Sequence, residues 1–241
     1  MKKKNYIKRL LFTITLVASG TMITLSNVTA SDIISSNSLS TDENLSIQEQ
    51  IDKNTTLKDL TIEEIYSRVA EGSNISYEEA KKELLDEARV RYYQENARAR
   101  SFVTVSESTL ENYVVGSHKQ LESFYYLVNA DGAKCFLRFG ALVEIRGSGS
   151  FTYISAIKKG TEFILAHGTG NHTYTGGYIT SSLVDGNRIR IFATGNVESI
   201  VSQTHGPAYS KKGFSFGGTV GNDIIYRKSV TLDKVLKLHT K

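Results

Sequence analysis

The chain has 241 residues, with 29 lysines and arginines, 25 aspartates and glutamates and a formal charge of +4. Five of the basic residues and none of the acidic ones lie in the first thirty positions, so the remainder carries 24 basic and 25 acidic residues. This near balance excludes overall basicity as an argument for nucleic-acid binding. The single cysteine, Cys135, excludes an internal disulfide, and its apolar neighbours predict that it lies in a core.

The first thirty residues have the pattern of an export signal. A basic start at residues 2–9 precedes an apolar run at residues 10–25 and the small residues of 28–30. Such an order is typical of a secretory signal peptide. The run is short for a bilayer-spanning helix, although a retained membrane anchor is the alternative. We therefore predict a secreted, extracellular protein whose signal peptide, residues 1–30, is removed after Ala30.

The next segment, residues 31–56, is polar and begins with a serine-rich stretch. Few large apolar side chains occur there, so the segment has little surface to bury. We predict a disordered polar linker with a weak helical turn near residues 47–51.

Residues 57–100 are predicted to form a helical hairpin, which could act as a prosegment. Thr61 and Ser76 are each followed three residues later by a glutamate, the spacing of a capping box. In that motif the two residues cap the first amide groups of a helix reciprocally. Gly72 would end the first helix in a left-handed conformation.

Charge is distributed unevenly between the two halves of the chain. Residues 31–100 carry nine basic and fifteen acidic side chains, whereas residues 101–241 carry fifteen basic and ten acidic ones. The first segment could therefore mask the second until cleavage near Arg100. The alternatives are ordinary solvated surfaces and, at Arg100, a helix end whose cations suit the helix dipole.

Residues 101–241 are predicted to form an antiparallel β domain, either a sandwich or a closed barrel. Short runs rich in β-branched and aromatic residues alternate with glycine-containing turns. At 188–194, apolar and polar residues alternate, as in a strand with one buried face. The expected strands lie near 123–129, 134–146, 150–158, 161–167, 173–184, 188–201, 209–219 and 223–231.

One candidate site consists of His167 and His172, which flank a glycine-rich turn. On facing strand ends they could share a metal ion, with Asp185 or His205 as a third ligand. The alternative is a hairpin loop whose histidines are surface residues. Because an antiparallel domain lacks the strand-to-helix turn that presents a hydrolase serine, we predict no other catalytic residue and no cofactor.

The second candidate site is a basic aromatic surface. Tyrosine offers an apolar face and a hydroxyl group, and nearby cations would attract an anionic cell-envelope polymer or a membrane surface. Tyr174 and Tyr178 would lie on one face of a regular strand, and the cations would gather if the last two strands pair. The alternative is that tyrosines fill half-buried sheet positions. The candidate ligand-binding residues are Tyr174, Tyr178, Tyr209, Lys211, Lys212, Tyr226, Arg227 and Lys228.

Three functions follow from these patterns. The first is a secreted, non-enzymatic β-sandwich module that binds an extracellular or cell-envelope ligand and no nucleic acid. The second is a secreted toxin or antimicrobial precursor in which residues 31–100 mask the basic domain. The third is a metal-dependent hydrolase that uses His167 and His172.

Overall fold

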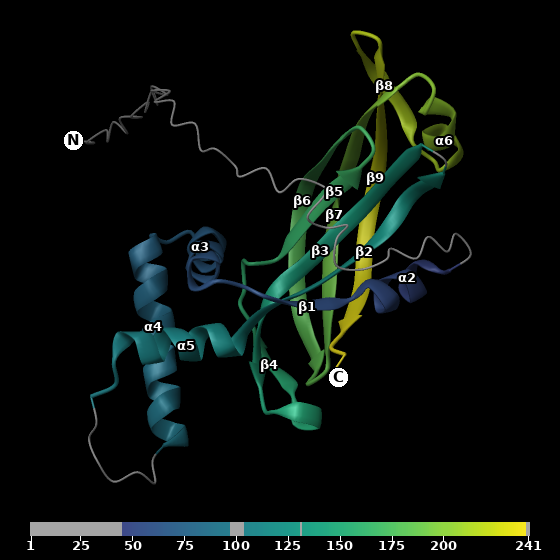
Figure 1. Cartoon of the computed structure of the whole chain (residues 1–241). Helices are drawn as coiled ribbons and strands as arrows, with labels where there is room; N and C mark the ends of the chain where they lie inside the picture. Colours follow the sequence, from purple (N-terminus) through teal and green to yellow (C-terminus); the bar gives the residue numbers. More distant parts are fainter. Residues whose placement is uncertain (1–44, 97–103, 131, 240–241) are drawn as a thin grey trace, which may run out of the picture. The chain divides into compact units, whose positions relative to one another are not determined.

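The computed structural model describes residues 45–96, 104–130 and 132–239 (Figure 1). This part of the chain is mainly β, with two antiparallel sheets, as predicted. The expected signal peptide and both processing positions, Ala30 and Arg100, lie outside the described residues.

The first sheet has five strands, and β3 is its central strand. Along one side β3 pairs with β2, and on the other side it pairs with β5 at residues 135–140 and with β4 at residues 143–146. β1 pairs with β2 and forms an edge. The strands are β1 (Thr56–Asp59), β2 (His118–Ala130), β3 (Ala133–Arg146), β4 (Tyr153–Ile157) and β5 (Phe163–Gly168).

The second sheet has four strands in the order β6-β7-β9-β8. They are β6 (Asn171–Asp185), β7 (Arg188–Ser202), β8 (Ser215–Val220) and β9 (Asp223–Lys237). Along β7, Ile189 and Ile191 are fully buried, whereas Arg190 is exposed and pairs with Asp233. The predicted alternation of a buried and a wet face is therefore confirmed.

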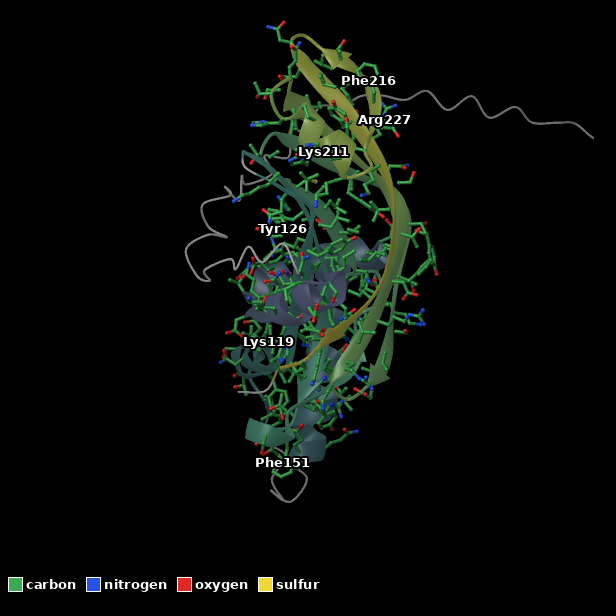
Figure 2. The ribbon with its side chains drawn as sticks, turned by 90° about the vertical axis from the view of Figure 1, so that its right-hand side faces the viewer. Lys119, Tyr126, Phe151, Lys211, Phe216 and Arg227 are labelled. Carbon is green, nitrogen blue, oxygen red and sulfur yellow. The ribbon has the colours of Figure 1, made fainter. Side chains whose placement is uncertain are left out.

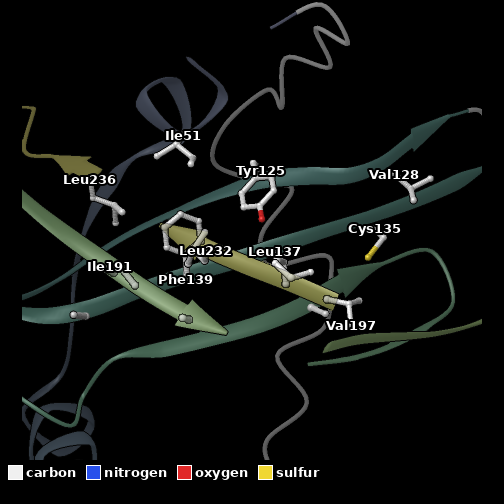
Figure 3. Close-up of a cluster of buried hydrophobic side chains, with 14 of the residues drawn as sticks. Ile51, Tyr125, Val128, Cys135, Leu137, Phe139, Ile191, Val197, Leu232 and Leu236 are labelled. Carbon is white, nitrogen blue, oxygen red and sulfur yellow. The ribbon is translucent and has the colours of Figure 1, made fainter. Parts of the chain in front are cut away.

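One hydrophobic cluster draws its side chains from both sheets, so the sheets face each other across it (Figure 3). Cys135, Leu137 and Phe139 of β3 contribute from one side, and Val197 and Leu232 of β7 and β9 from the other. Cys135 has no exposed surface, which confirms its place in the core. Without disulfides, this burial is the main source of stability in the β region.

Three helices, α3 (Ile62–Ser73), α4 (Tyr77–Glu95) and α5 (Glu107–Ser117), bury a second cluster. Both predicted capping boxes are present, at Thr61 and Ser76. Leu142 joins this cluster from β3, so the helices cover part of the outer face of the first sheet. The predicted β domain at residues 101–241 is wrong in its first part, because Ser106 caps the helix α5, which packs with the other helices.

The linker prediction is wrong for residues 47–54, which form the helix α2 (Ile47–Asn54). Ser46 begins this helix with a third capping box. Ile51 has no exposed surface and packs into the core between the sheets. The helix is also tied to the sheets by hydrogen bonds, such as those from Gln48 to Val235 and from Asn54 to Phe124.

The end of α3 differs from the expectation for Gly72. Asn74, with φ of 54°, adopts the left-handed conformation that ends the helix. A side-chain carbon at Gly72 would lie 2.5 Å from the backbone of Gly160. Gly72 is therefore needed for close packing against the loop before β5, because no larger residue fits there.

The expected strand at 209–219 is wrong in its first half. Residues Gly206–Lys211 form the short helix α6, with Pro207 in its first turn, and β8 begins only at Ser215. Proline suits a first helical turn because its missing amide proton would be unpaired there in any case.

Candidate functional site

The two histidines proposed as metal ligands point to different parts of the protein. His167 lies opposite Phe136 and stacks on its ring, with centroids 5.6 Å apart. His172 lies opposite Ser199, and its Nδ1 is 2.9 Å from the Ser199 hydroxyl group. Among the described residues no group of three or more His, Cys, Asp or Glu side chains could hold a metal ion. The geometry therefore gives no support to a shared metal at His167 and His172.

The two other proposed ligands have local roles. Asp185 accepts hydrogen bonds from the Asn187 amide and the Arg188 guanidinium group in the β6–β7 turn. The Nδ1 of His205 is 3.2 Å from the hydroxyl group of Ser202.

His172 instead belongs to a polar network at one end of the core. Its Nε2 is 3.1 Å from the backbone oxygen of Lys134, which also accepts from the Tyr209 hydroxyl group at 3.2 Å. Burial is the main cause that lowers the pKa of His172, and burial raises the pKa of Cys135 to about 12. Ser199 has no exposed surface. The Ser199–His172 pair thus connects strands and offers no accessible nucleophile.

Residues 213–217 read G-x-S-x-G, the letters of a hydrolase serine turn. That turn requires a strand followed by a helix. Here the order is reversed, because α6 precedes the segment and β8 begins at Ser215. Ser215 pairs with Arg227 of β9 in the sheet, so the match is one of letters alone.

Two members of the predicted ligand-binding set, Tyr209 and Tyr226, belong to the core. Tyr209 has no exposed surface and Tyr226 is 7% exposed. Their rings stack with centroids 5.8 Å apart. Neither residue is a ligand-binding surface residue or a half-buried sheet residue, because Tyr209 is buried in α6 and Tyr226 is buried in β9.

Tyr174 and Tyr178 do not share a face, because β6 has an irregularity between Gly176 and Tyr178. Tyr174 lies opposite the buried Val197, and its ring covers Gly176 and Gly195. Tyr178 lies opposite Thr194 on the other face and is 59% exposed. An extra residue in a strand reverses the alternation beyond it.

The cations of the predicted set do gather at the end formed by α6, β8 and β9. Lys211 and Lys212 are exposed at the end of α6, and Lys228 donates to the backbone oxygen of Lys212. Arg227 points to the opposite face of β9, where it pairs with Glu198 at 3.3 Å.

An aromatic surface that was not predicted from the sequence lies on the outer face of the first sheet. Residues of β2, β3 and β5 align across the sheet in three rows. These rows, which we call the aromatic face, are Tyr126–Phe136–His167, Phe124–Arg138–Leu165 and Glu122–Gly140–Phe163. Tyr126 marks this face in Figure 2.

The rings of the aromatic face pack in tilted and edge-to-face contacts and remain partly exposed. The Phe136 centroid lies 5.5 Å from that of Phe124 and 5.7 Å from that of Tyr126. All three rings are half-buried, and Leu165 is 44% exposed. Aromatic rings at these spacings stabilise one another, so the face is a preformed surface rather than a set of separate side chains.

Charged groups border the aromatic face. Arg138 donates to both carboxylate oxygens of Glu122, at 2.8 and 2.6 Å. The guanidinium groups of Arg138 and Arg68 each lie over the Phe163 ring, at 5.8 and 5.6 Å. Burial, followed by the charge of Arg138, lowers the pKa of His167. His167 is therefore neutral near pH 7.

A charged groove between α4 and the β3–β4 pair was also not predicted from the sequence. Arg91 and Glu144 form a buried ion pair at 2.9 Å, and Arg146 also bonds Glu144 at 2.9 Å. Lys158 pairs with Glu87 of α4. These groups are saturated by one another, so the groove fastens α4 to the sheet.

No protein-family model, curated protein or solved structure matches this chain. Within the described ranges, no helix has the length and apolar character needed to cross a membrane. Any functional conclusion therefore depends on the surfaces of the molecule itself.

Proposed function

We propose that this chain is an exported, non-enzymatic β-sandwich module that binds a glycan of the cell envelope on its aromatic face. The observation that carries the proposal is the aromatic face itself, in which half-exposed rings from three strands align in register. Export is inferred from the basic, apolar and small-residue pattern of residues 1–30.

The chemistry of the aromatic face suits a sugar polymer. Sugar rings have an apolar face that stacks on aromatic side chains and hydroxyl groups that need polar partners, which sites of this kind combine. Phe124 and Phe136 would supply the apolar surface, and Arg138, Glu122 and Tyr126 the polar groups. The face offers few rings, so weak binding repeated along a polymer is expected.

The masked-precursor alternative is less compatible with the packing. Residues 45–96 supply Ile51 to the main core, β1 to the first sheet and Tyr66 to the helical cluster. Removal of a segment that is so extensively buried would expose large apolar surfaces. We therefore favour a mature protein that retains this segment.

Retention on insoluble envelope polysaccharide tests the proposed function. The double variant Phe124→Leu with Phe136→Leu keeps apolar volume but removes both rings, and we expect it to lose most of the retention. Tyr178→Leu, on the other sheet, is the matched control and should be retained like the parent protein. Equal retention of the double variant and the parent, with both folded by circular dichroism, would contradict the proposal.

A further inference from the structure

The end formed by α6, β8 and β9 exposes large apolar side chains on a short edge strand. Phe216 is 68% exposed and Val220 is 56% exposed, and both belong to β8. The strand is glycine-rich around them and ends in a turn at Gly221. The irregularity between Phe216 and Gly218 places Phe216 opposite Tyr226 and Val220 opposite Asp223, so the two side chains lie on opposite faces of β8. Phe216 is the larger and more exposed of the two and is available to a partner.

Phe216 lies in a segment that is rich in cations. Residues 205–228 contain Lys211, Lys212, Arg227 and Lys228 and a single acid, Asp223. Figure 2 shows Lys211, Phe216 and Arg227 at the same end of the molecule. The nearest acid on the neighbouring strand is Glu198, which pairs with Arg227. The three lysines remain free of carboxylate partners in the described part of the chain.

The lysines are held on a rigid support. Lys228 lies over the Phe214 ring, 5.4 Å from its centroid, and donates to the Lys212 backbone. Phe214 is 5% exposed and contacts the buried Tyr209 at a centroid distance of 5.1 Å. The Lys228 ammonium group is thus held against the buried ring pair Phe214–Tyr209 and tied to the backbone of Lys212.

We propose that this end of the protein docks on a bilayer of anionic lipid, separately from the glycan site. The lysines would contact the lipid phosphates, while Phe216 would enter the interfacial region. Positive charge complements an anionic leaflet, and exposed aromatic and aliphatic side chains gain free energy when they enter the boundary between lipid headgroups and acyl chains. A soluble polyanion would use the lysines but not Phe216, which is why we assign a lipid surface.

The absence of tryptophan makes a direct test possible. Phe216→Trp introduces a single reporter at the proposed site, and Phe151→Trp places one at an 84% exposed position at the other end (Figure 2). The chain from residue 31 onward, which contains the compact unit Asp42–Lys241, avoids interference from the apolar leader. Each variant is mixed with vesicles of pure phosphatidylcholine or of phosphatidylcholine with phosphatidylglycerol.

We expect the emission of Phe216→Trp to shift to shorter wavelength with the anionic vesicles only, and that of Phe151→Trp to stay unchanged. Lys211→Gln with Lys212→Gln should weaken co-sedimentation with anionic vesicles by roughly tenfold or more. The exposed pair Lys82→Gln with Lys159→Gln is the charge-matched control and should bind like the parent. No shift at Phe216→Trp, an equal shift at Phe151→Trp, or binding of soluble polyphosphate but not vesicles would overturn the proposal.

Discussion

The outer faces of the two sheets differ in how their side chains find partners. On the second sheet, exposed neighbours on β7 and β9 pair with each other, as Arg190 does with Asp233 and Asn196 with Ser229. On the first sheet, helices bury one part of the outer face around Leu142, and aromatic rings occupy the rest. The second sheet keeps an exposed aromatic contact, Tyr178 with Phe192, but most of its polar groups pair in water, whereas the larger group of rings on the first sheet needs a covering layer or a ligand.

The largest expected effect concerns charge under the helices. Arg91→Ala should lower the free energy of unfolding by about 3–4 kcal/mol, because it leaves Glu144 buried with only Arg146 as a partner. Arg190→Ala, on the exposed pair of the second sheet, should cost about 0–1 kcal/mol. Urea unfolding measures both values. Similar losses for the two variants would remove the contrast between the faces.

Truncation of Leu142 should have a slightly smaller effect. Leu142 is 1% exposed and joins β3 to the helical cluster, so Leu142→Ala should cost about 2–4 kcal/mol. Leu183, which is 43% exposed on β6, should tolerate the same change with a loss below about 1 kcal/mol. Chemical denaturation of both variants tests whether the helices truly depend on this contact.

Protonation of His118, the first residue of β2, should lower the free energy of unfolding at low pH. Burial is the main cause that lowers the pKa of His118 to about 4, so the unfolded chain takes up a proton at higher pH than the folded one. Stability from this residue is full above about pH 6.5 and is lost as the pH falls toward 4, by about 2–3 kcal/mol.

The test compares how steeply the free energy of unfolding changes with pH in the parent protein and in a variant without His118. His118→Gln should flatten the slope between pH 6.5 and 4, leaving the smaller part expected from His167 and His172, whose pKa values burial also lowers. An unchanged slope in His118→Gln would show that His118 is not the group responsible.

The smallest effect is expected at a helix cap. Thr61 accepts from the Glu64 amide and begins α3, so Thr61→Ala should cost about 1 kcal/mol. Thr61→Ser, which keeps the hydroxyl group, is the control and should be close to neutral. If both changes have the same effect on thermal unfolding, the cap does not stabilise the helical layer.

The sequence by itself determined the features that depend on near neighbours. The buried face of β7, the capping boxes at Thr61 and Ser76 and the place of Cys135 in the core all follow from local periodicity and composition. These patterns can be recognised in the sequence because side chains recur on one face of a strand or helix at a fixed spacing. Local patterns did not predict the helices α2, α5 and α6, whose segments were expected to be linker or β structure.

Only the tertiary structure decided which side chains meet. An irregularity in β6 separates Tyr174 from Tyr178, and the core takes up Tyr209 and Tyr226. The aromatic face unites Tyr126, Phe136 and His167 from three strands through the register of β2, β3 and β5. Strand pairing is non-local, and a shift of one residue exchanges the two faces of a strand, so the surfaces of this protein are fixed by how its strands align.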